Sequence, residues 1–270
     1  MPSLESGLYD FGRLDRLAYL DSPVHQLDPR AKVVTTLVFL VCVVSFGKYQ
    51  LLPMLPFLVF PVFTVAEGGL PMGFLLRKVA VVAPFALFVG IFNPLLDRAV
   101  VGQIAGVDIP GGWVSFASIM LRFVLTASAA LTLVATTGMS GVCAALERLG
   151  LPDVLATQLL LLYRYIFVLG EETMRMVRAR ALRSFGRHGM GMRVYVNMLG
   201  HLLLRTYAHA QRLYQAMLAR GFDGRVRVLR RLQFDGRDVA YMLGWSAAFV
   251  VFRLVNVPLL LGGLLTELIV

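Results

Sequence analysis

The sequence predicts an all-α membrane protein with about five transmembrane helices and a cytoplasmic domain of one short and two long helices. Composition is the first observation: 58% of the 270 residues are hydrophobic and 16% are charged, against about 45–50% and 25% in soluble domains. The second is a mean hydropathy of +0.73. The third is charge placement, because 16 of the 26 Lys and Arg, all of them Arg, lie in residues 138–237.

Five apolar segments predict the transmembrane helices, since a span needs roughly 20 mostly apolar residues. The first two nearly adjoin, which predicts a tight hairpin. The second contains Pro53, Pro56 and Pro61, which a membrane helix tolerates where neighbouring groups bond the freed carbonyls. The five segments cover about residues 31–52, 51–65, 79–96, 113–137 and 239–265.

The basic residues of the loops predict the orientation through the positive-inside rule. They precede the first segment, lie between the second and third as Arg77 and Lys78, and fill the region between the fourth and fifth. The N-terminus and the Arg-rich region are therefore expected in the cytoplasm. The predicted parts are a cytoplasmic N-terminal segment (1–30), four spans (31–137), a cytoplasmic Arg-rich domain (138–237) and a fifth span with the C-terminus (238–270).

The Arg-rich domain has the pattern of helices. A short amphipathic helix over residues 141–149 ends before Gly150 and Pro152, which is a usual stop signal. A first long helix is expected from Pro152 to about residue 184, and a second from about residue 192 to 220. Gly221 stands where a left-handed cap would end the second long helix.

The sequence contains no pattern that assigns catalysis or metal binding to this chain. No GxxxxGK[ST], HExxH or GxSxG motif is present, so the chain is not expected to bind ATP phosphates or to act as an enzyme. His201 and His209 would lie roughly 12 Å apart on one helix, too far to share a metal ion. Membrane lipid and an acidic protein are the expected partners of the basic residues, and nucleic acid is the poorest fit because the surrounding chain is membrane-embedded.

Two arginines lie inside apolar spans, namely Arg122 and Arg253. An ionisable group at such depth is a candidate for function. One interpretation is a self-sufficient permease whose substrate site uses Arg122, Arg253 or Asn93. The other is that each arginine bonds a backbone carbonyl or extends toward the membrane surface, which is favoured because no predicted span holds an acidic partner.

The two long helices of the Arg-rich domain end alike. Each end places an Arg beside a small residue and then a Phe, and a guanidinium can bind a carboxylate through two parallel hydrogen bonds. Two matching ends on consecutive helices predict docking to a protein, although a single Arg at a helix C-terminus is common. The segments are Ala181-Leu182-Arg183-Ser184-Phe185 and Leu218-Ala219-Arg220-Gly221-Phe222.

These ends, together with two other segments, resemble a known family. Residues 27–30 read Leu-Asp-Pro-Arg before the first span, and residues 150–152 read Gly-Leu-Pro before the first long helix. The chain is similar over roughly residues 20–262 to the T components of energy-coupling-factor transporters, and among them to the CbiQ type. The first Arg motif has Leu182 where the family often has Ala, so Arg180, within Ala179-Arg180-Ala181, is kept as a second choice beside Arg183.

The resemblance implies a non-catalytic coupling subunit in the bacterial inner membrane. Its two helix tips would enter grooves of two CbiO-like ATPase subunits, which bind ATP and Mg²⁺. A separate CbiM-like membrane subunit, with a small CbiN-like subunit as an optional addition, would hold Co²⁺ or Ni²⁺ for import linked to cobalamin biosynthesis. The choice among cobalt, nickel and a vitamin, and the ATPase stoichiometry, stay open. The implied coupling residues are Arg183, Ser184, Ala219, Arg220 and Gly221, with Arg180 as the alternative.

Overall fold

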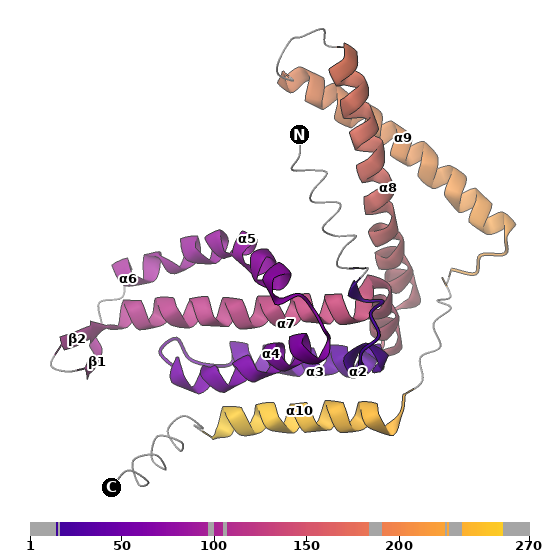
Figure 1. Cartoon of the computed structure of the whole chain (residues 1–270). Helices are drawn as coiled ribbons and strands as arrows, with labels where there is room; N and C mark the ends of the chain where they lie inside the picture. Colours follow the sequence, from indigo (N-terminus) through magenta and orange to yellow (C-terminus); the bar gives the residue numbers. More distant parts are fainter. Residues whose placement is uncertain are drawn as a thin grey trace. The chain divides into compact units, whose positions relative to one another are not determined.

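The computed structural model describes residues 15, 17–96, 100–104, 107–183, 191–224, 226 and 234–255. These residues fall into two compact units that divide after Gly138. We call residues 15–138 and 234–255 the bundle unit, and residues 139–226 the rod unit, after its two long helices. Figure 1 shows a predominantly helical chain, as the sequence predicts.

The bundle unit begins with two helices that start at prolines. Helix α2 covers Pro23–Gln26, and α3 covers Pro29–Val44. Asp28 caps α3, because its side chain accepts a hydrogen bond from the Arg30 N–H. Pro29 occupies the first turn, where its missing N–H costs nothing. Helix α3 ends earlier than the apolar segment does, with Ser45 as its C-cap.

The proline-rich second segment is not one continuous α-helix. It forms the 3₁₀ helix η1 over Leu52–Leu58 and then the α-helix α4 over Val59–Glu67. Pro53 and Pro56 lack the N–H groups that an α-helical turn would use, which explains the irregular start.

The third segment begins earlier than its apolar run. Helix α5 covers Met72–Gly90, so Arg77 and Lys78 lie within a helix and not in a loop as expected. Pro71 stands at the N-cap position, which explains the early start because proline readily begins a helix.

A short helix and a small sheet follow α5. Helix α6 covers Phe92–Leu96, and the strands β1 (Val100–Ile104) and β2 (Val107–Pro110) pair antiparallel with Gly102 opposite Ile109. This small hairpin was not expected from the sequence, because it lies in a connection between apolar segments.

The remaining helices agree well with the sequence pattern. Helix α7 covers Gly111–Arg148 but contains a break at Gly138, whose φ of 70° and ψ of 155° are not helical. The break separates the predicted fourth span from the short helix that follows it. Helices α8 (Asp153–Arg183), α9 (Met192–Ala219) and α10 (Gly236–Leu254) complete the chain.

Three described helical segments are long and apolar enough to cross a membrane. They are Met72–Pro94, Gly111–Arg148 and Asp153–Arg183, while Leu52–Glu67 is apolar but shorter. The first covers most of the predicted third span, and the second contains the predicted fourth. The third is α8, whose N-terminal half is almost wholly apolar although we expect it in the cytoplasm. Length and composition therefore do not decide the side on which α8 lies, and its cytoplasmic location stays a prediction.

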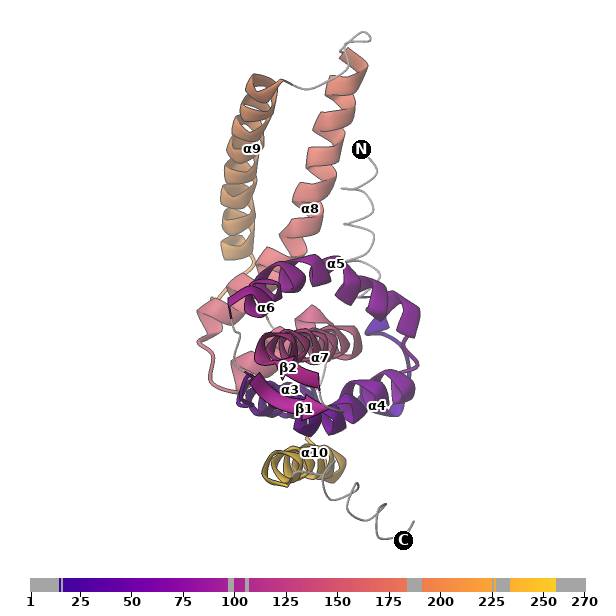
Figure 2. The same cartoon turned by 90° about the vertical axis from the view of Figure 1, so that its left-hand side faces the viewer.

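The bundle unit has a core of aromatic rings. Phe39, Phe57 and Phe249, from α3, η1 and α10, are fully buried. The Phe39 and Phe249 rings meet edge to face with centroids 5.2 Å apart, and Phe60 lies 5.1 Å from Phe249. Figure 2 looks along α7 and shows α3, α4 and α5 around it.

The start of α10 is bonded to the start of α3. The Asp28 N–H donates to Asp238 Oδ1 at 2.7 Å, and the Asp235 N–H donates to Asp238 Oδ2 at 2.9 Å. Asp238 is buried, and it belongs to the capping box that begins α10. One carboxylate therefore satisfies two backbone donors on segments that lie far apart in the sequence.

Candidate docking site at two arginine-tipped helices

Helix α9 ends in a Schellman motif. The Phe222 N–H donates to the Met217 carbonyl and the Gly221 N–H donates to the Leu218 carbonyl, both at 3.0 Å. Gly221 has a φ of 77°, a conformation that glycine adopts without steric cost. The predicted left-handed cap is confirmed. Arg220 is the C-cap residue and is exposed, so the motif presents its guanidinium at the very end of the helix.

Helix α8 is described to Arg183, one residue before the end that the sequence pattern predicts. Arg180 and Arg183 both lie in its last turn and are exposed, and Leu182 between them is 83% exposed. Ser184, the other predicted residue of this tip, lies outside the described residues. Because Arg180 and Arg183 are both exposed, the structure does not choose between them.

The tip arginines differ from the arginines farther along the same helices. Within the described residues, the guanidinium groups of Arg183 and Arg220 have no ion-pair or hydrogen-bond partner. In contrast, Arg175 pairs with Glu171 at 3.4 Å on α8, and Arg205 of α9 bonds Glu172 of α8. The guanidinium donors at the tips are therefore available for a partner.

Helices α8 and α9 form an antiparallel pair in the rod unit (Figure 2). The Arg205–Glu172 bond joins them, and the Tyr165 and His209 rings lie 5.6 Å apart. Only residues 184–191 connect the two helices, so the end of α8 lies near the start of α9. Since 28 residues extend about 42 Å, the Arg220 tip lies at the opposite end of the pair from Arg183.

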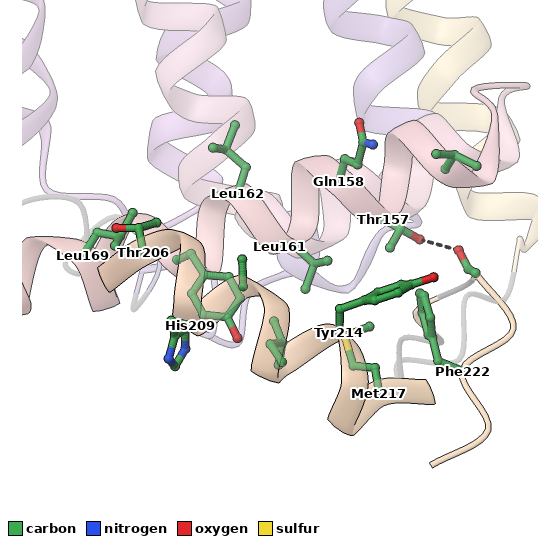
Figure 3. A pocket seen from close by; sticks show the side chains of 15 residues that line it. Thr157, Gln158, Leu161, Leu162, Leu169, Thr206, His209, Tyr214, Met217 and Phe222 are labelled. Atoms are coloured by element: carbon green, nitrogen blue, oxygen red, sulfur yellow. Dashed lines mark hydrogen bonds between the residues drawn. The ribbon is translucent and has the colours of Figure 1, made fainter. Parts of the chain in front are cut away.

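An apolar groove runs between the N-terminal half of α8 and the C-terminal half of α9. Its volume is about 550 Å³, and Figure 3 shows Leu161, Tyr214, Met217 and Phe222 along it. The Thr157 hydroxyl donates to the Gly224 carbonyl at 3.3 Å and holds the chain after α9 at the groove's end. This groove is not predicted from the sequence. The features that indicate it are the apolar first half of α8 and the apolar stripe of α9.

The histidines that the structure describes, His25, His201 and His209, are dispersed. His201 and His209 are exposed on α9, whereas His25 is buried, with Nε2 2.9 Å from the Leu17 carbonyl oxygen. Across the described ranges, no three His, Cys, Asp or Glu residues gather as they would around a metal ion.

The two arginines of the apolar spans both bind the end of α3. Arg122 Nη2 donates to the Phe46 carbonyl at 3.0 Å, and Arg253 Nη2 donates to the Ser45 carbonyl at 3.1 Å. The sequence left two interpretations of these arginines, a substrate site and a bond to a backbone carbonyl. The structure contains the bond to a backbone carbonyl. Neither arginine belongs to the rod unit, where the predicted docking residues lie.

A comparison with known proteins decides the family of the chain. A family profile described as cobalt transport protein, CbiQ, matches residues 21–229. The chain belongs to the CbiQ family. It is therefore a membrane protein of the transporter class, and its resemblance to this family is confirmed.

Relatives with assigned names agree with this family. The energy-coupling factor transporter transmembrane protein EcfT of Heliobacterium modesticaldum is 30% identical, over 87% of this chain and 94% of the relative. EcfT of Bacillus subtilis is 29% identical, over 82% and 89%. The nickel permease LarQ of Lactiplantibacillus plantarum is 34% identical over 33% of each chain. Similarity to EcfT over most of its length makes this chain a transmembrane component of an energy-coupling-factor transporter.

Proposed function

We propose that this chain is the coupling subunit of an energy-coupling-factor importer for cobalt or nickel ions, and that its two helix tips bind two ATPase subunits. The observation that carries the proposal is the pair of exposed arginines, Arg183 and Arg220, at opposite ends of one antiparallel helix pair. The family supports cobalt, and the partial similarity to a nickel permease supports nickel.

The geometry of the pair suits two partners. The tips are separated by about 42 Å, the length of α9, so one groove cannot take both. Each tip would enter its own ATPase subunit, where the guanidinium binds a carboxylate through paired hydrogen bonds. Ser184, Ala219 and Gly221 are small, and they let the backbone of a tip approach the groove wall.

The same geometry suits the transfer of motion. When ATP draws two ATPase subunits together, the Arg183 and Arg220 tips are displaced relative to one another. Helices α8 and α9 are joined by the exposed Arg205–Glu172 bond and by side chains around an open groove, and we expect these contacts to permit a change of their relative angle. Displacement of the tips would change that angle and pass the motion to the membrane.

The chemistry of import belongs to partner subunits in this proposal. ATP and Mg²⁺ would be bound and hydrolysed by CbiO-like subunits, so this chain is not an enzyme. The cobalt or nickel ion would be held by a CbiM-like membrane subunit, with a small CbiN-like subunit as an optional addition. The N-terminus and residues 138–237 would face the bacterial cytoplasm.

Charge reversal at the tips tests the proposal. Arg183→Glu and Arg220→Glu are each expected to weaken ATPase co-purification by about a hundredfold or more, because reversing a paired interfacial charge costs several kcal/mol. Arg180→Glu tests the alternative register at the first tip. The matched control for Arg220→Glu is Arg212→Glu. Arg212 is an exposed arginine of α9, and its Nε donates to the Ala208 carbonyl at 3.3 Å.

Two outcomes would contradict the proposal. One is stoichiometric ATPase binding and normal metal uptake by both tip variants. The other is metal uptake into vesicles that contain this chain alone, which would favour a self-sufficient permease. Membrane insertion of each variant is checked separately, so that a failure to fold is not mistaken for a loss of docking.

A further inference from the structure

The C-terminal end of α3 receives two guanidinium groups from two different helices. Arg122 of α7 donates through Nη2 to the Phe46 carbonyl at 3.0 Å. Arg253 of α10 donates through Nε to the Ser45 hydroxyl at 2.8 Å and through Nη2 to the Ser45 carbonyl at 3.1 Å. The Arg253 guanidinium also lies over the Phe46 ring, 4.6 Å from its centroid. Two positive charges therefore meet at consecutive residues of one helix end.

The charge at this helix end is not balanced by the bonds to α3. A helix C-terminus carries about −0.5 elementary charge, so two arginines leave about +1.5. Within the described residues, neither arginine has a carboxylate at ion-pair distance. The described carboxylates that flank α3 and α10, Asp28, Asp235 and Asp238, lie at the other ends of these helices. Both arginines belong to predicted spans, where an uncompensated charge is costly.

The hydrogen-bond donors are also incompletely used. A guanidinium has five N–H donors. The bonds to Ser45 and Phe46 use one donor of Arg122 and two of Arg253. Arg122 Nε is buried and has no acceptor among the described residues. A ligand that brings several anionic oxygens would balance the charge and accept hydrogen bonds from the remaining terminal N–H donors.

Aliphatic residues close in sequence to Ser45 and Arg253 are exposed. Val41 and Val44 on the last turn of α3 are 68% and 61% exposed, and Leu254 beside Arg253 is 78% exposed. Lys48 follows three residues after Ser45 and adds a further positive charge nearby. Guanidinium groups and exposed aliphatic side chains together suit a ligand that has an anionic head group and acyl chains. A free phosphate ion would use only the guanidinium groups.

We propose that Arg122 and Arg253 bind the phosphate group of an anionic phospholipid at the C-terminal end of α3. The lipid phosphate accepts hydrogen bonds from both guanidiniums, and its chains lie along Val41, Val44 and Leu254. In the orientation that the loop charges predict, this end of α3 lies in the outer leaflet. The site is independent of the ATPase-docking tips, which belong to the rod unit.

Native mass spectrometry of the purified full-length chain tests the proposal. The chain is titrated with phosphatidylglycerol, phosphatidylcholine or inorganic phosphate. The unsubstituted chain is expected to bind phosphatidylglycerol tightly and the other two weakly. Arg122→Gln and Arg253→Gln should each weaken phosphatidylglycerol binding about tenfold, and the double variant about a hundredfold, since each removes charge-assisted hydrogen bonds.

Two further variants separate lipid binding from helix capping. Arg77→Gln removes an exposed arginine of α5 and is expected to leave this binding unchanged. Ser45→Ala removes a bond of Arg253 without removing its charge, so it should lower the melting temperature yet retain phosphatidylglycerol. The proposal is overturned if the double variant binds phosphatidylglycerol as tightly as the unsubstituted chain, or if Ser45→Ala loses the lipid equally. Equal affinity for phosphatidylcholine or inorganic phosphate would likewise overturn an anionic lipid as the ligand.

Discussion

The bundle unit and the rod unit differ in whether their apolar residues form a buried core. In the bundle unit, Phe39, Phe57 and Phe249 are fully buried against one another. In the rod unit, α9 is described over its whole length and buries none of its 28 residues. Leu199 and Leu203 of α9 are 61% and 70% exposed.

This difference indicates where the chain needs partners. The bundle unit has an aromatic core that holds helices from both ends of the sequence together. In the rod unit, α8 buries only Ala156 and Val177 and α9 buries no residue, so most of their apolar residues are exposed or half-buried. Isolated helices are stabilised chiefly by packing of an apolar face, so α8 and α9 are expected to depend on partner subunits or lipid for their final arrangement.

The largest expected effect comes from truncating the aromatic core. Phe39→Ala should lower the free energy of unfolding of the bundle unit by about 3–5 kcal/mol, because Phe39 is fully buried against Phe57, Phe60 and Phe249. Leu203→Ala on α9 should change the free energy of unfolding of the rod unit by less than about 0.5 kcal/mol. Unfolding of the purified chain in mixed micelles measures both. Equal losses in the two variants would refute the contrast between the units.

A smaller effect is expected where Asp238 joins α10 to α3. Asp238→Ala leaves the Asp28 and Asp235 N–H groups without their acceptor, which should cost about 2–4 kcal/mol in total. Asp238→Asn retains one carbonyl oxygen and should cost about half as much. The same unfolding measurement applies to both. An Asp238→Ala variant as stable as the unsubstituted chain would show that these bonds do not hold the bundle unit together.

The smallest effect is expected at the tip of α9. Gly221→Ala places a side chain at a φ of 77° with open space around it, so the cost is backbone strain of about 1–2 kcal/mol. Hydrogen exchange at the Phe222 amide should increase while the stability of the bundle unit stays the same. Gly200→Ala is the matched control, because it replaces a glycine in the middle of α9 and should stabilise the helix. Equal exchange in both variants would mean that the cap does not stabilise this end.

Local sequence signals predicted the ends of elements well. Asp28 and Pro29 begin α3, and Gly221 ends α9, as their capping preferences require. Arg77 is an exception, because its charge interrupts an apolar pattern and predicts a loop, yet it lies in α5. Positions that depend on distant contacts are predicted poorly. The carbonyls that Arg122 and Arg253 bond belong to residues far away in the sequence, and no pattern of side chains reveals a carbonyl.

The sequence by itself determined the membrane class, the order of the helices and the two arginine ends, because composition, helical period and capping residues act over a few neighbouring positions. The tertiary structure alone decided that Asp238 bonds the start of α3 across 210 residues, that two arginines meet at the end of α3, and that α8 and α9 enclose a groove. These features arise when elements distant in sequence satisfy one another's unpaired donors or apolar faces. Such pairings depend on the packing of the whole chain, which local patterns do not record.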